Sequence, residues 1–261
     1  PAMTAARFAE AVEKTPQGKS VNMKLAQLLV DVFRSQSIAV LGNVLIAMGL
    51  AALIAFGYQY KTGEPLMNAD QIAYQLHSID PFAGTLWFAA IAGVWLFCSG
   101  IISGYFDNRS NYLNMRMRLA QHPLLKKLMS EKTRVKFANY MHENYGSLIG
   151  NLCFGMLLGI TGVVGYLTHL PLDIRHVAFS SANVGYIAVS GEFTYSLLLQ
   201  CIAFVLLIGL VNLIVSFSLT LWVALRSLNA EIDSWWPIWH EVCQIVKKRP
   251  LSLFLPVQLD K

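Results

Sequence analysis

The sequence predicts an all-α membrane protein, a polytopic helical bundle of about four transmembrane helices with additional amphipathic and interfacial helices. Apolar residues make up 55% of the 261 residues and charged residues only 13%, about half the charged share of a soluble globular domain. The few charges are grouped between long uncharged runs. Because a soluble bundle seldom contains such runs, we expect the chain to lie in a lipid bilayer.

Four uncharged stretches are long enough to cross the hydrocarbon core, which takes about 20 apolar residues at about 1.5 Å per residue. They are residues 38–58, 82–105, 148–167 and 197–225, and none contains Asp, Glu, Lys or Arg. Together they define a transmembrane domain at 38–225. The fourth stretch exceeds the bilayer thickness, so we expect it to tilt or to extend into the cytoplasm.

The distribution of Lys and Arg predicts the orientation, because basic flanks resist translocation across a membrane. Of the 20 basic residues, five precede the first stretch, eight lie in the connection 106–147 and five follow residue 225. The two remaining loops carry one each, Lys61 and Arg175. We therefore expect both termini and the 106–147 connection on the cytoplasmic side, where anionic lipid head groups are the default partner for the net charge of +5.

The two terminal segments are expected to be cytoplasmic. Residues 1–37 contain an amphipathic helix at 23–33, whose apolar side chains recur with helical spacing. We expect this helix on the membrane surface or against the 106–147 connection. The tail, residues 226–261, places three tryptophans where aromatic residues anchor at the interface: Trp235, Trp236 and Trp239.

The connection 106–147 is too long for a bare loop, and its spacing predicts a helical hairpin made of helices at 111–121 and 123–145. Pro123 suits the first turn of the second helix. The hairpin is strongly basic, and its candidate contact residues are Arg116, Arg118, Lys126, Lys127, Lys132, Arg134 and Lys136. These side chains suit contact with anionic lipid on a membrane surface, and the alternative partner is the phosphate backbone of DNA.

Residues 176–190 are uncharged, too short to span the membrane and too apolar for a solvated loop, so we expect the outer segment 170–190 to be re-entrant or interfacial. It contains the densest group of candidate functional residues, Asp173, Arg175 and His176. If the segment enters the membrane boundary, Asp173 and Arg175 can pair while His176 faces a cavity. The alternative is a salt bridge that only orders the loop before a short helix.

Glycines in two spans follow the GxxxG pattern, which lets helix backbones approach closely in lipid. The residues expected to pack helices are Gly100, Gly104, Gly155, Gly159 and Gly162. The pattern fits packing within one chain and packing between two copies equally well, so a homo-oligomer is one expected arrangement.

The sequence predicts no metal and no cofactor, and its catalytic residues are unknown. His122, His142 and His240 are isolated, and HExxH, CxxC, GxxxxGK[ST], GxGxxG and GxSxG are all missing from the sequence. The spans hold neutral amides such as Gln200 and Asn212 in place of ionisable groups. Ion-coupled transporters usually keep ionisable groups at this depth, and interhelical hydrogen bonding explains the amides.

The run QHPLLKKLMSEKTRVKFANYMHENYGSLIGNLCFGMLLGITGVVGYLTHLPLDIRHVAFSSANVGY, at 121–186, resembles a bacterial membrane family described as site-specific recombinases. IGLVNLIVSFSLTLWVALRS, at 208–227, is similar to the closing span of that family. LPLDIRH-xx-FSSAN, at 170–183, is the most specific part. The resemblance implies a bacterial inner-membrane protein of greater length with a soluble N-terminal region, which would fit a chain that begins at Pro1.

These observations favour an integral inner-membrane protein with a lipid-associated or scaffold role. The first alternative is membrane-tethered DNA recombination, implied by the family name, with catalytic residues outside this chain. Tyrosine recombinases need a Tyr nucleophile, several Arg and an HxxR box around the phosphate, and only Arg175 next to His176 resembles part of that set. The second alternative is a transporter or channel whose path lies near Gln200, Asn212 and the segment 173–176.

Overall fold

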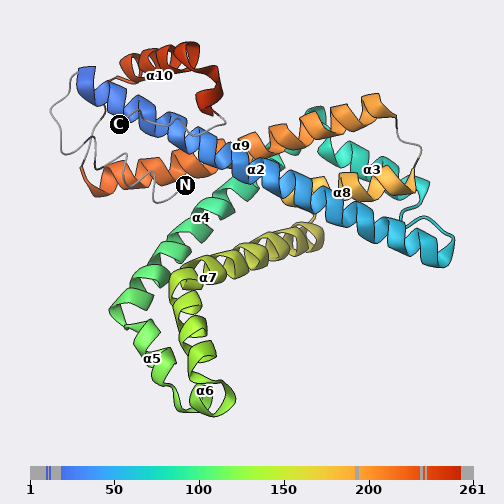
Figure 1. The fold of residues 1–261 in the computed structure, drawn as a ribbon. Coiled ribbons are helices and arrows are strands. Elements are labelled where there is room, and N and C mark those ends of the chain that lie inside the picture. The colour runs from blue at the N-terminus through green and yellow to red at the C-terminus, as the bar shows by residue number, and fades with distance from the viewer. Residues whose placement is uncertain are drawn as a thin grey trace. The chain divides into compact units, whose positions relative to one another are not determined.

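The computed structural model describes residues 10, 12, 19–191, 194–229, 232 and 234–253. Every regular element in these residues is a helix (Figure 1), which confirms the all-α prediction. Contacts divide the chain into two units. One combines Met3–Val94 with Asp173–Lys261, and the other is Trp95–Leu172. Helix α4 belongs to both units, because the division falls between Val94 and Trp95.

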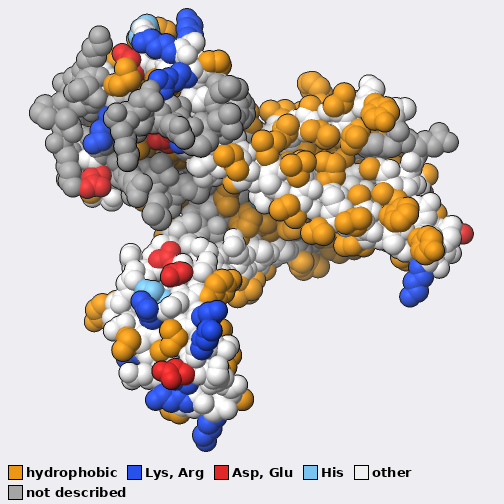
Figure 2. Space-filling view, viewed as in Figure 1, with side chains coloured by type: hydrophobic (Ala, Val, Ile, Leu, Met, Phe, Trp, Pro, Cys, Tyr) orange, Lys and Arg blue, Asp and Glu red, His pale blue; other side chains and the backbone are white. Residues whose placement is uncertain are grey.

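Four helices are long and apolar enough to cross a membrane, as the sequence predicts. They are α2 (Lys19–Thr62), α4 (Thr85–Tyr112), α7 (Glu131–Thr168) and α9 (Tyr195–Ser227). The most apolar 18-residue window of each helix is only 17% to 28% buried, and Figure 2 shows apolar side chains covering much of the right-hand part of the visible face. A soluble protein rarely exposes so much contiguous apolar surface, so these helices are suited to a lipid environment.

Two predicted helix boundaries are wrong. The amphipathic segment 23–33 is continuous with the first span in α2, because the sequence has no Gly or Pro from residue 19 to residue 41. The single helix expected at 123–145 is divided into α6 (Pro123–Leu128) and the start of α7. Met129 is extended, and the Ser130 side chain caps α7 by accepting a hydrogen bond from the Thr133 N–H.

One helix was not predicted. Helix α3 (Ala69–Ile79) lies in the loop between the first two spans. Its start is fixed by a capping box, because Asn68 accepts from the Gln71 N–H while the Gln71 side chain accepts from the Asn68 N–H. A short 3-10 helix, η1 (Pro81–Ala83), and the left-handed Gly84 connect α3 to α4.

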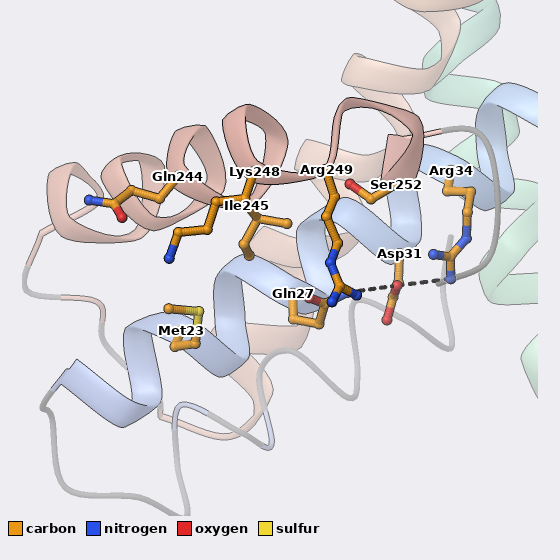
Figure 3. Close-up of a pocket in the computed structure, with 9 residues that line it drawn as sticks. All are labelled: Met23, Gln27, Asp31, Arg34, Gln244, Ile245, Lys248, Arg249 and Ser252. Carbon is orange, nitrogen blue, oxygen red and sulfur yellow. Dashed lines mark hydrogen bonds and ion pairs between the residues drawn. The ribbon is translucent and has the colours of Figure 1, made fainter. Parts of the chain in front are cut away.

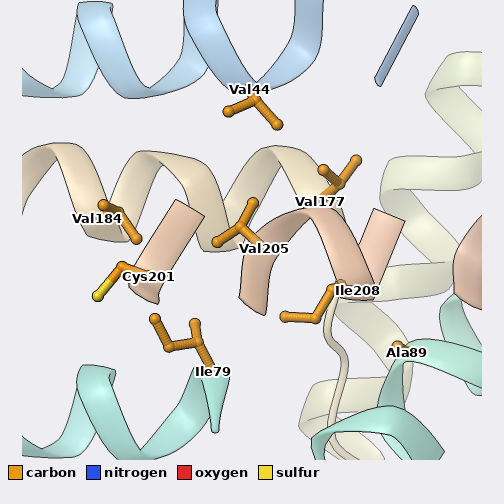
Figure 4. Packing of buried hydrophobic residues seen from close by; sticks show 8 residues of the cluster. All are labelled: Val44, Ile79, Ala89, Val177, Val184, Cys201, Val205 and Ile208. Carbon is orange, nitrogen blue, oxygen red and sulfur yellow. The ribbon is translucent and has the colours of Figure 1, made fainter. Parts of the chain in front are cut away.

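In the first unit, the short helix α8 (Val177–Ser190) packs on α2 and α9. Figure 4 shows the buried cluster that joins these helices with the end of α3 and the start of α4. Two glycines permit the close approach: a Cβ on Gly185 of α8 would collide with the Met48 carbonyl oxygen of α2, and one on Gly209 of α9 would lie 3.0 Å from Val40 and 3.1 Å from Val177.

A second cluster of the same unit lies where α2 begins and α9 ends, and α10 (Trp236–Lys248) covers it. Ile238 of α10 is buried with Leu25 of α2 and Leu221 of α9. The apolar face expected at 23–33 is therefore packed against α9 and α10. Trp236 and Trp239 remain exposed on α10, as interfacial anchors require.

In the second unit, α4 packs against α7 through small side chains. A Cβ on Gly146 would collide with Asp107 and with the Ser103 carbonyl oxygen, and one on Gly150 would lie 2.9 Å from the Ser103 Cβ. The Asp107 carboxylate accepts a 3.0 Å hydrogen bond from the Gly146 N–H. Figure 1 shows α7 as a bent helix, which is expected where a side chain takes a backbone N–H from the helical ladder.

Candidate functional site

The chain between the third and fourth spans contains a non-helical lead-in to α8. Helix α7 ends at His169, which has a left-handed backbone with φ of 54°, and α8 begins after His176. The first residue of α8, Val177, packs beside Gly209 of α9, within the predicted fourth span. The end of the lead-in is therefore buried against α9, where backbone polar groups need partners from the protein.

Arg175 supplies many of these partners and is itself largely buried, with 16% of its side chain exposed. Its Nε donates a 2.8 Å hydrogen bond to the Ser78 carbonyl oxygen, and Nη1 donates to Ile174 at 3.1 Å. Nη2 lies 2.6 Å from the Asp173 carboxylate, which is 42% exposed. The guanidinium also lies 5.9 Å from the centre of the Phe88 ring, a cation–π distance.

Asn212 of α9 connects the lead-in to two helices and is only 2% exposed. Its Nδ2 donates to the Ala89 carbonyl oxygen at 2.7 Å and to the Arg175 carbonyl oxygen at 3.1 Å. Its Oδ1 accepts from the Val177 N–H at 3.2 Å. One side-chain amide thus satisfies backbone groups at the start of α4, in the lead-in and at the first turn of α8.

His176 caps α8, because its Nδ1 accepts from the Ala178 N–H at 3.4 Å. Burial lowers the pKa of His176 from 6.5 to about 4, because desolvation disfavours the charged imidazolium. The positive end of the α8 dipole and the use of Nδ1 as an acceptor act in the same direction. The imidazole is therefore neutral at pH 7.

The structure pairs Asp173 with Arg175, places the next residue, His176, at the N-cap of α8, and adds partners that sequence spacing could not supply. The Ser78 carbonyl oxygen accepts from Arg175 and also from the Thr85 hydroxyl, at 3.0 Å. Gln200, predicted near the same path, is exposed on α9. The arrangement combines a neutral histidine and a paired arginine with a non-helical segment whose backbone is bonded to α4 and α9.

The seven predicted basic residues of the hairpin occupy α5 (Met115–Gln121), α6 and the first turns of α7. Arg134 is half-buried, and its Nε donates to the Ala120 carbonyl oxygen at 2.6 Å, so it holds the end of α5 in place. The other six are exposed. Leu124 and Leu128 on α6 are also exposed, at 61% and 78%. They lie on either side of Lys126 and Lys127 in the sequence.

Most of the glycines predicted to pack helices face open space within the described chain. A Cβ on Gly104, Gly155, Gly159 or Gly162 would meet no other atom within 4 Å. The close contact is made by a different GxxxG pair on the same helix, Gly146 and Gly150, which the sequence analysis did not single out. Packing of these glycines against a second copy of the chain stays a prediction.

In the part of the chain that the structure describes, no three His, Cys, Asp or Glu side chains lie close enough together to hold a metal ion. The four cysteines are unpaired.

The helices and the buried polar break define the class of the protein, a polytopic helical membrane protein. A family model described as "Site-specific recombinase" matches residues 1–256. The match covers nearly the whole chain, so the chain belongs to this family, as the resemblance implied. Neither the curated proteins nor the solved structures contain a significant match to it.

Proposed function

We propose that this chain is the membrane-embedded part of a bacterial inner-membrane protein, with both termini cytoplasmic, and that it acts as a lipid-associated scaffold. The observation that carries the proposal is the tip of the basic hairpin. Leu124 and Leu128 are exposed beside Lys126 and Lys127 on α6, and further exposed basic side chains flank them on α5 and α7.

Exposed leucines among lysines suit the boundary between lipid head groups and acyl chains. Each basic residue near an anionic surface contributes about 1 kcal/mol to binding, and burial of a leucine side chain contributes about 1.5–3 kcal/mol. Interspersed apolar and basic side chains are the pattern of interfacial helices. Phosphate contact with DNA would use the lysines but leave both leucines in water.

The test places a fluorophore on a Gln121→Cys variant without native cysteines, in nanodiscs that contain brominated lipids. We expect quenching in discs with anionic lipid, and loss of quenching in high salt and in a Lys126→Gln, Lys127→Gln double variant. Lys61→Gln is the matched control, since it removes an exposed charge at the end of α2, outside the hairpin. Unquenched fluorescence in every lipid would contradict the proposal. Sequence-specific DNA cleavage through a covalent intermediate would favour recombination.

A second candidate function, transport, is favoured by Arg175 and Asn212, which are largely buried at the non-helical segment before α8. A charged side chain at membrane depth is costly and usually serves a pathway or a ligand, and the N-terminus of α8 points positive backbone groups into the same region. Flux assays in proteoliposomes test this candidate with Arg175→Gln, and an unchanged flux for all substrates tried would count against it.

A further inference from the structure

The part of α7 that belongs to the basic hairpin is fixed to α4 by side-chain contacts. A hydrogen bond of 3.1 Å links the Ser110 hydroxyl of α4 to Nδ1 of His142. One turn further along α7, the Tyr145 ring packs edge-on against the Phe106 ring, with 5.6 Å between the ring centres. This half of α7 therefore keeps its direction relative to α4.

The other half of α7, which contains the third predicted span, moves away from α4. A Cβ on Gly150 would lie 2.9 Å from the Ser103 Cβ of α4, whereas one on Gly155 or Gly159 would meet no atom within 4 Å. The close backbone approach thus ends after Gly150. Three large apolar side chains on the following turns are exposed: Leu152, Met156 and Ile160.

Gly146 lies at the change between these two halves, two residues before the predicted span 148–167. In a regular helix its N–H would donate to the carbonyl oxygen of His142, four residues back. The Asp107 carboxylate of α4 competes for this N–H and accepts a 3.0 Å hydrogen bond from it. A charged acceptor forms the stronger hydrogen bond. An acceptor inserted into the helical ladder bends a helix, and Figure 1 shows that α7 is bent.

Only glycine at position 146 allows this hydrogen bond. A Cβ there would collide with the Asp107 carboxylate and with the Ser103 carbonyl oxygen, so the carboxylate could not reach the N–H. The next residue is Ser147, and Gly–Ser pairs are frequent positions of helix kinks. The hydrogen bond and the local sequence therefore favour a bend at one place, and only the first cause needs Asp107.

We propose that Asp107 is a latch that holds α7 in its bent form, and that α7 turns at Gly146 when the hydrogen bond between them opens. The hairpin stays fixed to α4, while the direction of residues 147–168 changes relative to it. This conformational device links the position of the hairpin to the direction of the third span. It goes beyond the proposed lipid-associated function and does not depend on it, because the same turn would follow from hairpin contact with any partner.

The test is the distance between spin labels at Lys132→Cys and Ile160→Cys in a chain without native cysteines, measured by double electron–electron resonance. Both positions are exposed and lie 14 residues from Gly146, so a straight helix would place them about 42 Å apart and a bent helix closer. We expect the shorter distance in the otherwise unchanged chain and a shift toward about 42 Å in Asp107→Ala. Asp107→Asn keeps an acceptor oxygen and should keep the shorter distance. Asn108→Ala, at the next and exposed residue of α4, is the matched control and should leave the distance unchanged.

A second variant and a second pair of labels keep the test independent of any one substitution. Gly146→Ala should lengthen the distance as Asp107→Ala does, because its Cβ takes the position of the carboxylate oxygen. Labels at the exposed Tyr112 and Lys132 both lie in the hairpin, so their separation should stay the same in every variant. Circular dichroism checks that each variant keeps its helices.

Three results would overturn the proposal. An unchanged distance from Lys132 to Ile160 in Asp107→Ala would assign the bend to the Gly–Ser pair alone. Equal lengthening in Asn108→Ala would show that the effect is not specific to the latch. A changed distance from Tyr112 to Lys132 would show that the hairpin itself opens, and that α7 does not turn at Gly146. Fluorescence quenching at the hairpin tip tests the proposed function separately, since these distances are measured without reference to lipid contact.

Discussion

Asn212 is the residue whose removal should damage the first unit most. Asn212→Ala removes three hydrogen bonds at once, two from Nδ2 and one to Oδ1. At about 0.6 kcal/mol for each interhelical hydrogen bond in a membrane protein, the loss is about 2 kcal/mol. Because the Val177 N–H, at the first position of α8, would stay buried without a partner at about 1–3 kcal/mol, we expect a destabilisation between about 2 and 5 kcal/mol.

The assay is equilibrium unfolding of the purified chain in dodecyl maltoside with increasing sodium dodecyl sulfate. Asn151→Ala is the matched control, because it makes the same chemical change at an exposed amide of α7 and should alter stability by no more than about 0.5 kcal/mol. Hydrogen exchange supplies a local readout, and the Val177 amide should lose protection in Asn212→Ala alone. Equal stability of the two variants, or unchanged exchange at Val177, would refute the reasoning.

Three further predictions concern pH, packing and orientation. Since the pKa of His176 is about 4 in the folded chain and 6.5 when exposed, both states are neutral above pH 6.5. Between pH 6.5 and 4 only the unfolded state gains the proton, so the stability of the folded chain should fall by about 3 kcal/mol. Thermal unfolding of His176→Asn should lack this part of the pH dependence. If stability falls with pH in this variant as steeply as in the wild type, the prediction is contradicted. Gly146→Ala should destabilise the chain by about 1–3 kcal/mol, because the new Cβ would collide with Asp107 and Ser103. Gly155→Ala on the same helix, where a Cβ meets no atom, should be neutral or stabilising by up to about 1 kcal/mol. Chemical denaturation distinguishes the two variants, and the reverse order of stability would be inconsistent with the packing. In intact cells without native cysteines, an impermeant thiol reagent should label a cysteine at the exposed Lys61 but not one at Lys127, and the opposite labelling would invert the topology.

The four spans could be predicted from the sequence because length and lack of charge are summed over about 20 residues, so no single residue decides them. Boundaries depend on individual residues. The break before α7 depends on the Ser130 cap, and α3 depends on the Asn68–Gln71 capping box. Both signals are present in the sequence, but they are short and occur by chance in loops.

The candidate site was predicted only in part. Asp173 and Arg175 are two residues apart, so their pairing could be proposed from the sequence. The contacts with Ser78 and Asn212 join residues 97 and 37 positions away in the chain, and no local pattern specifies them. For the same reason, GxxxG spacing could not distinguish Gly146, which faces α4, from Gly155, which faces no atom of the chain.

Helix α2 runs without interruption through 44 residues, a length of about 66 Å. Arg34, which pairs with Asp31 near the start of α2 (Figure 3), and Met48, which meets Gly185 of α8, are therefore fixed on one helix about 21 Å apart. A straight rod cannot tilt at one end alone. A change in the tilt of α2, the usual response of a long span to bilayer thickness, would therefore move the Met48–Gly185 contact together with the end of the helix that α10 covers.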